Sequence, residues 1–128
     1  MTDIVKLIQT MPDLYTMEGA SVQEIQNAEQ ALGLKFAADY REYVAAFGAI
    51  SFESHELTGV CNFKRLNVVD VTIEERRNTD VLDDWYVVEQ ANIDGIVIWQ
   101  DASGSVYQTG PGVKQKRLCK SLAAYIEL

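Results

Sequence analysis

The sequence predicts an α+β fold, in which N-terminal helices pack on one face of a mainly antiparallel sheet and a C-terminal helix closes the side. Three observations support this class. Apolar residues recur at helical spacing as far as Gly48, and the period then shortens to that of strands. Asp94-Gly95 marks a hairpin turn between two β-rich runs. The length of 128 residues fits a single domain spanning 1–128.

The N-terminal segment predicts a helix from Thr2 or Asp3 to Met11, which Pro12 ends. Its apolar face has the helical spacing of Ile4, Leu7, Ile8 and Met11. The acidic start is unlike a signal peptide, and no run approaches the ~18 apolar residues that a membrane span needs. We therefore expect a cytoplasmic protein without a membrane partner.

The next segment, 21–48, predicts two amphipathic helices joined by a short connector. Ser21 and Glu24 form a capping box, and Gly33 suits the position after the first helix. The apolar face of this helix comprises Val22, Ile25, Ala28 and Leu32. Asp39 lies near the start of the second helix, where a carboxylate suits the helix dipole. The apolar stripe there comprises Tyr40, Tyr43, Val44 and Phe47.

Short strands are expected between 50 and 60 and at 66–71. Thr72 and Glu75 form a second capping box, which predicts a charged helix to Asn78. The clearest β signals are three runs rich in aromatic and β-branched residues, at 85–93, 96–100 and 105–109. At the end of the chain, Ser121 predicts a capped helix. Its buried side comprises Leu122, Tyr125 and Ile126.

Turn lengths predict the register of the hairpins. A two-residue loop pairs Ile93 with Ile96, and a four-residue loop pairs Gln100 with Ser105. One face, expected under the helices, collects Val87, Ala91, Ile93, Ile96, Ile98 and Tyr107. The opposite face collects Tyr86, Val88, Val97, Trp99 and Val106, mixed with Gln90, Asn92 and Gln108. Such a mixed face either stays open to a partner or lies under a second layer of core, and the pattern leaves both open.

Several short motifs match those of a known superfamily. They are Ala28-Glu29, Leu32-Gly33, Asp39-Tyr40-Arg41-Glu42-Tyr43, Phe47-Gly48, Trp99-Gln100-Asp101 and Gly104-Ser105-Val106-Tyr107. From about Gly19 to its end, the chain resembles the SUKH superfamily. That superfamily includes many bacterial immunity proteins, which neutralise polymorphic toxins, and a fungal cell-wall regulator. Ala37 and Ala38 stand where the family usually has a proline.

The resemblance implies a non-enzymatic cytoplasmic binding protein. Its leading implication is a bacterial immunity protein that neutralises a cognate toxin domain by direct contact. The alternative is a regulatory or scaffolding module on the same fold, not linked to a toxin. Either function implies a protein partner, a monomer or weak dimer, and no catalytic residue, cofactor or metal.

The net charge of −8 is unevenly distributed. Residues 1–110 hold 18 acidic and 7 basic residues, whereas 111–128 hold 4 basic and 1 acidic. An acidic body argues against direct nucleic-acid binding, which needs a basic surface, but it can steer a basic protein partner. We expect the basic tail to pair with the acidic body; its bases are Lys114, Lys116, Arg117 and Lys120.

The most prominent cluster of candidate binding residues is acidic, and it comprises Glu74, Glu75, Asp80, Asp83 and Asp84. Such a run is usually a solvated surface, but it can also mimic phosphates toward a basic toxin. We predict a partner-binding surface in which Tyr86 and Trp99 are apolar anchors and Asp80, Asp83 and Asp84 form a charged rim.

No catalytic or metal-binding set is visible in the sequence. His55 is the single histidine, and Cys61 and Cys119 are far apart, whereas zinc needs three or four ligands at motif spacing. We expect a surface histidine and two free, partly buried cysteines. Glu29 is expected to hold the helix pair together through an internal hydrogen bond or a salt bridge with Arg41.

Overall fold

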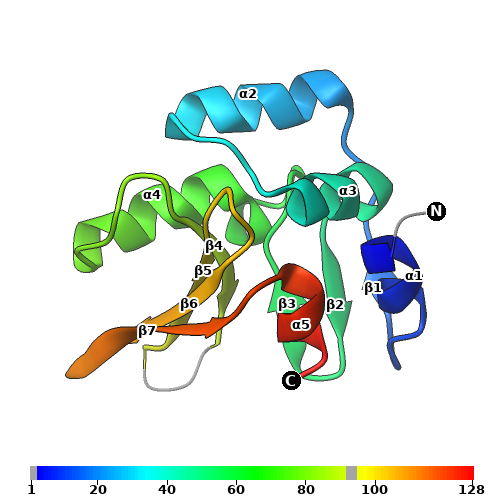
Figure 1. Cartoon of the computed structure of the whole chain (residues 1–128). Coiled ribbons are helices and arrows are strands. Elements are labelled where there is room, and N and C mark those ends of the chain that lie inside the picture. The colour runs from blue at the N-terminus through cyan, green and yellow to red at the C-terminus, as the bar shows by residue number, and fades with distance from the viewer. Residues whose placement is uncertain (1–2, 92–94) are drawn as a thin grey trace.

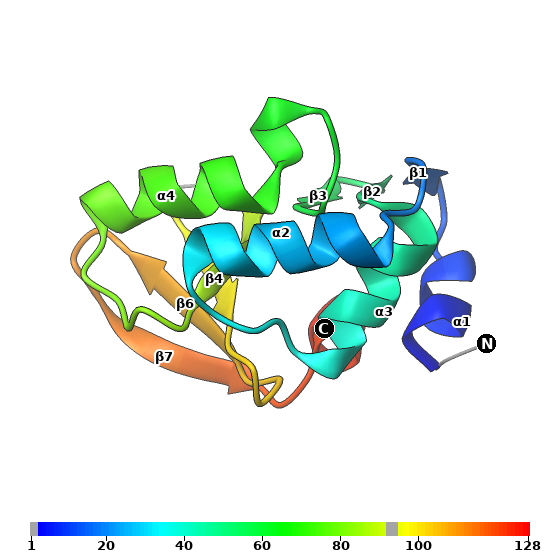
Figure 2. The ribbon, with the colours of Figure 1, turned by 90° about the horizontal axis from the view of Figure 1, so that it is seen from above.

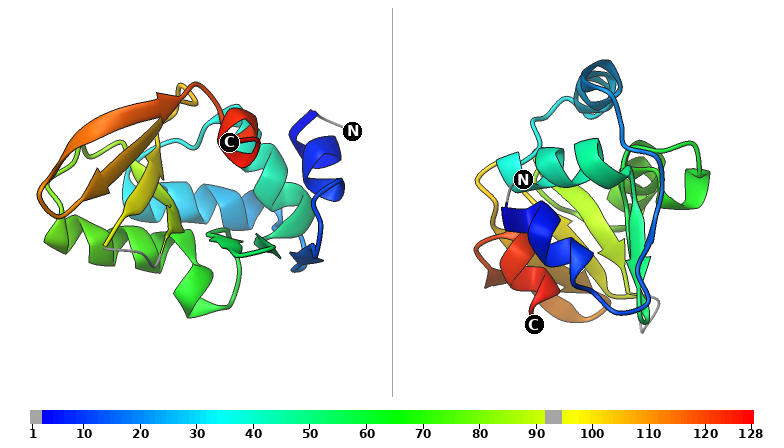
Figure 3. Two further views of the ribbon diagram at one scale, coloured as in Figure 1. Left: turned by 90° about the horizontal axis from the view of Figure 1, so that it is seen from below. Right: turned by 90° about the vertical axis from the view of Figure 1, so that its right-hand side faces the viewer.

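The computed structural model describes residues 3–91 and 95–128, and within them seven strands form one antiparallel sheet whose order follows the chain. The strands are β1 (Tyr15–Thr16), β2 (Ile50–Phe52), β3 (His55–Leu57), β4 (Tyr86–Gln90), β5 (Val97–Gln100), β6 (Val106–Gly110) and β7 (Val113–Cys119). The short β1 and the long β7 are therefore the two edges. Figure 3 shows β7 at the outer margin of the sheet.

The helices surround this sheet (Figure 1). They are α1 (Asp3–Gln9), α2 (Val22–Leu32), α3 (Ala38–Phe47), α4 (Val68–Asn78) and α5 (Leu122–Ile126), with a 3-10 turn at Lys64–Leu66. Viewed from above, α2 lies alongside α4 and crosses α3, while α1 and α5 contact each other and α3 (Figure 2). The predicted α+β class is confirmed.

Local sequence signals define α2. The Ser21 hydroxyl accepts a hydrogen bond from the Glu24 amide at 3.1 Å, and the Glu24 carboxylate accepts one from the Ser21 amide at 2.9 Å. Gly33 ends the helix with a φ of 68°, which glycine adopts without steric cost. The predicted capping box is thus confirmed. Val22 is the exception on the predicted apolar face, because 73% of its surface is exposed. It is the first residue of α2, and the buried residues of the helix begin at Ile25.

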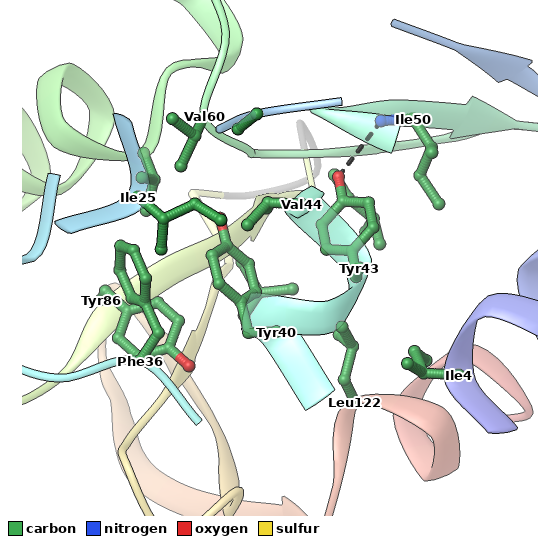
Figure 4. Close-up of a cluster of buried hydrophobic side chains, with 14 of the residues drawn as sticks. Ile4, Ile25, Phe36, Tyr40, Tyr43, Val44, Ile50, Val60, Tyr86 and Leu122 are labelled. Atoms are coloured by element: carbon green, nitrogen blue, oxygen red, sulfur yellow. Dashed lines mark hydrogen bonds between the residues drawn. The ribbon is translucent and has the colours of Figure 1, made fainter. Parts of the chain in front are cut away.

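The main core lies between α3 and the sheet (Figure 4). Tyr40, Tyr43 and Val44 are completely buried, as the stripe on α3 predicted, while Phe47 is half-buried. The Tyr43 hydroxyl donates to the Thr58 carbonyl at 2.7 Å and accepts from the Ile50 amide at 3.1 Å. These bonds join α3 to β2 and to the segment after β3 without leaving a buried polar group unsatisfied.

A second, smaller core fills the opposite face of the sheet. There, Val71 of α4 packs against Trp85, Val87, Val97 and Trp99, with Tyr107 at the border. The predicted arrangement placed the helices on one face, and α4 adds a layer on the other. The face of the sheet that carries Val97 and Trp99 is therefore covered.

The start of α4 corrects two predictions. Residues 66–71 do not form a strand, and Thr72 does not begin the helix. Asn67 is the N-cap, and its side-chain oxygen accepts hydrogen bonds from the amides of Val69 at 2.9 Å and Asp70 at 3.4 Å. Thr72 is instead buried within the helix and accepts from the Val87 amide at 3.0 Å. A run of valines favours a strand locally, but here it supplies the buried side of a capped helix.

The hairpin registers also differ from the prediction. Gln90 lies opposite Val97, which requires a longer connection than two residues, and a bulge interrupts the pairing between Val87 and Glu89. Ile93 and Asp94 lie outside the described residues. Gln100 pairs with Val106 instead of Ser105, a slip of one residue. Because a one-residue slip reverses the faces, the predicted division of side chains between the two faces is wrong.

Close backbone packing joins the N-terminal segment to the sheet. The amide of Met17, just after β1, lies 3.0 Å from the carbonyl oxygens of Phe47 and Ala49. Glycines allow this approach, because a Cβ added at Gly19 would lie 2.2 Å from the Ala45 carbonyl oxygen. A Cβ added at Gly59 would lie 1.7 Å from the Gly48 carbonyl oxygen. Strand β1, which lies between α1 and α2, was not predicted.

Candidate functional site

The acidic loop, residues 80–84, connects α4 to β4 and is held by its backbone. Arg76 of α4 donates to the carbonyl of Asp83 at 2.6 Å and to that of Trp85 at 3.3 Å. Gln115 of β7 donates to the carbonyl of Asp80 at 2.6 Å. Side chains of α4 and β7 therefore anchor the loop through its main-chain oxygens. The aspartate carboxylates are not used in these bonds.

The three aspartates of this loop are exposed, as predicted. Within residues 3–91 and 95–128, no salt bridge involves Asp80, Asp83 or Asp84. Leu82 lies between them with 63% of its surface exposed. Glu75 lies on the last turns of α4 and accepts a hydrogen bond from Gln90 at 2.6 Å. The result is a fixed, negatively charged surface around one exposed apolar side chain.

Tyr86 is not an exposed anchor, which corrects the prediction. It is completely buried on the α3 side of the sheet, where it packs edge-on against Phe36 at 4.8 Å between ring centres. Its hydroxyl donates to Gln100 at 2.7 Å and accepts from the Ala37 amide at 3.0 Å. Burial raises the pKa of this hydroxyl well above its ordinary value. Tyr86 therefore ties the α2–α3 connector to the sheet.

Trp99 is also completely buried, and it faces the opposite side of the sheet from Tyr86. Its indole NH donates to the Thr109 hydroxyl at 2.9 Å, and its ring lies near Trp85 under α4. Tyr107 stacks on Trp85 with 4.0 Å between ring centres. Trp99 is therefore not an exposed anchor either, because the hairpin register differs from the predicted one and α4 covers this face.

Glu29 has the structural role that the sequence predicted. Its carboxylate is buried and accepts from the Phe36 amide at 2.8 Å and from Arg41 Nε at 3.1 Å. The first bond fixes the α2–α3 connector, and the second links the two helices. Both bonds end on Oε2, so a single oxygen of this carboxylate joins the connector and the two helices.

The sequence analysis missed a second buried carboxylate, Glu89 of β4. It accepts from the Glu56 amide at 3.0 Å and from the Tyr125 hydroxyl, and it lies 3.1 Å from His55 Nδ1. Three segments distant in sequence meet here, and the alternating pattern of β4 gave no signal for it. Burial and the adjacent Glu89 raise the pKa of Tyr125.

The Glu89 cluster has the components of an acid–base site but serves to join elements. Three donors already occupy the buried carboxylate of Glu89, and general-base catalysis needs a free acceptor within reach of a substrate proton. His55 stacks on Phe52 at the tip of the β2–β3 hairpin, with its ring half exposed. The cluster ties β3, β4 and α5 together.

The two cysteines are free and partly buried, as expected. Burial raises the pKa of the Cys61 and Cys119 thiols, so both are mostly protonated at neutral pH. In the part of the chain that the structure describes, no three His, Cys, Asp or Glu side chains are grouped to hold a metal ion.

The basic tail corresponds to β7 and the residue after it. Lys114, Lys116, Arg117 and Lys120 are exposed. Among the described residues, the ion pairs join Arg41 to Glu29, His55 to Glu89 and Arg65 to Glu56, and none involves the tail. The expected pairing of tail and acidic body is therefore wrong. Lysines on a long edge strand instead discourage pairing with a further strand.

No helix among the described residues is long and apolar enough to cross a membrane. The described polar clusters are occupied internally, whereas the acidic loop is fixed and open. These features describe a small α+β domain with an exposed acidic loop. A family model described as SUKH_5, SMI1-KNR4 cell-wall, matches residues 1–127, and the chain therefore belongs to this family. No curated protein matches it. Membership supports a non-enzymatic module of immunity or regulatory type.

Proposed function

We propose that this chain is a cytoplasmic immunity protein that neutralises a cognate toxin domain by direct contact. Membership of the family supports a binding module, and the observation that carries the choice of surface is the acidic loop. Three exposed carboxylates stand on a backbone that Arg76 and Gln115 already hold in place. A surface fixed before binding loses little conformational freedom when the complex forms.

The chemistry of this surface suits a basic partner. Asp80, Asp83 and Asp84 create a negative potential that accelerates the approach of a cationic surface, such as the substrate-binding face of a nuclease. Leu82 replaces the buried aromatic rings as the apolar contact of this surface, because it is the exposed side chain between the aspartates. The toxin is masked by stoichiometric binding and not by chemical modification.

The test first identifies the gene immediately upstream and, where it encodes a toxin domain, measures the association of this chain with that domain. Surface plasmon resonance at two ionic strengths compares the wild type with the triple variant Asp80→Asn, Asp83→Asn, Asp84→Asn. The control variant Asp13→Asn, Glu53→Gln, Glu127→Gln removes the same charge from exposed positions outside the loop. We expect the loop variant to associate at least ~10-fold more slowly and with less salt dependence than the control.

The outcomes separate the surface from the function. Equal kinetics for the two triple variants would remove the acidic loop from the interface and leave immunity standing. A toxin domain that neither binds the wild type nor is neutralised by it would overturn immunity. The second candidate, a regulatory module on the same fold, is favoured by the words "cell-wall" in the description of the matching family.

A further inference from the structure

A groove at the N-terminal end of α4, away from the acidic loop, is not explained by the proposed function. Two adjoining hollows, of about 450 Å³ and 350 Å³, share Glu24, Val60, Cys61 and Asn62 in their walls. We call them together the α2–α4 groove. It extends from the segment after β1, past the first turns of α2, to the N-terminal turn of α4. Figure 2 shows α2 and α4 alongside each other.

The first hollow presents exposed apolar side chains. Met17 and Phe63 both line it and are 37% and 46% exposed. Ala20 and Val60 add buried apolar surface to its wall. A concave surface with exposed apolar rims is a place where a partner can insert an apolar side chain, and a few such contacts usually carry most of the binding energy.

The charged groups that line the groove are all acidic. They are Glu18, Glu24 and Asp70, and no Lys, Arg or His is among its lining residues. Glu18 and Asp70 are exposed and take part in none of the described salt bridges. Hydrogen bonds from Ser21 hold the pKa of Glu24 below its ordinary value, so this carboxylate is ionised at neutral pH. The rim is therefore complementary to a cationic ligand.

Arg65, two residues after Phe63, is paired with Glu56 and not with this rim. Arg65 stacks on the Phe63 ring with its guanidinium 5.1 Å from the ring centre, and Glu56 binds it through two hydrogen bonds of 2.7 and 2.8 Å. Lys64 and Arg65 line a separate hollow, which shares only Asp70 with the groove. Arg65 thus supports the Phe63 ring while its charge is balanced by Glu56.

The walls of the groove are fixed by contacts within the fold. Asn67 donates to the Cys61 carbonyl at 2.7 Å, which holds the segment between β3 and α4. The Val60 amide donates to the Gly48 carbonyl at 3.0 Å, beside the close approach of Gly59. The groove is therefore preformed, and a ligand need not order it.

We infer that the α2–α4 groove docks a basic segment of a partner protein that carries a large apolar side chain between lysines or arginines. The apolar side chain enters the hollow between Met17 and Phe63, and the flanking cations meet Glu18, Glu24 and Asp70. This surface lies at the N-terminal end of α4, about 16 Å along the helix from the acidic loop. It does not depend on the partner being a toxin, since a regulatory partner can use it equally.

The first test uses the peptide Lys-Arg-Trp-Arg-Lys and the charge-reversed peptide Glu-Asp-Trp-Asp-Glu. Amide chemical shifts of the ¹⁵N-labelled full chain are followed during titration at low salt. We expect the basic peptide to shift amides at 17–20, 24–28 and 60–70, and the effect to weaken at least ~5-fold in physiological salt. Equal shifts with the acidic peptide, or shifts at the acidic loop or elsewhere without shifts at the groove amides, would overturn the inference.

Matched variants and the two thiols make the test specific. Glu18→Gln with Asp70→Asn should weaken peptide binding at least ~5-fold, whereas Asp13→Asn with Glu53→Gln removes the same charge from exposed positions outside both the groove and the acidic loop and should not. Phe63→Ala should also weaken binding, and melting temperatures confirm folding of each variant. Bound peptide should slow the labelling of Cys61, which lines the groove, and leave Cys119 unchanged.

Three results would show that this occupant is wrong. Equal affinities for the two charge variants would mean that the acidic rim does not select the ligand. Unchanged labelling of Cys61 at saturating peptide would place the peptide elsewhere. Shifts of the same amides that depend on protein concentration, without peptide, would show that a second copy of this chain fills the groove.

Discussion

Buried polar side chains hold distant segments of this chain together. Partly buried Asp39 does the same, because its two oxygens accept from the Leu122 amide at 2.7 Å and from Gln100 at 3.1 Å. One carboxylate near the start of α3 thereby contacts the N-terminus of α5 and the end of β5. Removing one such group is costly, because its buried partner then has no hydrogen bond.

Glu29 provides the first test at this scale. Glu29→Ala should cost about 2–3 kcal/mol in the free energy of unfolding, because it leaves the Phe36 amide buried without an acceptor. Arg41→Ala should cost about 1 kcal/mol or less, because its side chain is 45% exposed and water replaces the carboxylate. Urea unfolding measures both. Equal costs would show that the ion pair, and not the backbone hydrogen bond, carries the stabilisation.

Gly59 and Gly33 lack a side chain for two different reasons, close packing at Gly59 and a positive φ at Gly33. Substitution by alanine tests each reason. Gly59→Ala should cost roughly 3 kcal/mol or more, because the added Cβ meets the Gly48 carbonyl oxygen at 1.7 Å and the backbone cannot yield easily. Gly33→Ala should cost about 1–2 kcal/mol, since it adopts a φ of 68° with no atom within 4 Å of the added Cβ. Thermal unfolding followed by circular dichroism compares the two. The reverse order would contradict the close approach described for Gly59.

At the scale of elements, the N-terminal end of α4 can be tested directly. Asn67→Ala should destabilise the protein by about 1–2 kcal/mol, because the amides of Val69 and Asp70 lose their acceptor. Thr72→Asp should cost more, because it places a carboxylate in the core beneath α4. If Thr72 were the N-cap, aspartate would be tolerated and Asn67→Ala would have little effect. Urea unfolding of the two variants distinguishes these cases.

Elements could be predicted from the sequence where the residues that define them are close together in the chain. The ends of α2 were predicted because Ser21, Glu24 and Gly33 act within one turn of the helix. The hairpin registers were not predicted, because the β4 bulge and the turn lengths depend on packing from both faces. The start of α4 was missed because Asn67 and Thr72 both have cap chemistry, and burial against the sheet decides between them.

For the molecule as a whole, alkaline pH should reveal the buried tyrosines. Burial raises the pKa of Tyr40, Tyr43 and Tyr86 above the ordinary value, so the folded state retains protons that the unfolded state releases. Stability is therefore unaffected below pH ~10 and falls above it, by up to roughly 1.4 kcal/mol per pH unit for each buried tyrosine. Urea unfolding at pH 8 to 11 measures the fall, and absorbance at 295 nm follows ionisation. Ionisation of all six tyrosines before unfolding would contradict their burial.

The candidate surface was predictable in its charge and not in its apolar part. The exposure of Asp80, Asp83 and Asp84 follows from composition, since a run of carboxylates is rarely buried. Whether Tyr86 and Trp99 faced solvent depended on the sheet register and on the position of α4. The α2–α4 groove had no local signal either, because its walls come from four segments that are separate in sequence.

The order of the sheet has a consequence for how the chain folds during synthesis. Each strand pairs with the strand that precedes it in sequence, so every new strand leaving the ribosome meets an edge that already exists. Pairing between successive strands also shortens the loops that must close, which favours rapid folding. Contact between α1 and α5 joins helices that are far apart in sequence and must await the synthesis of α5. A ribosome-bound chain that ends after β6 should therefore already have a protease-resistant sheet, and release of β7 and α5 should complete it.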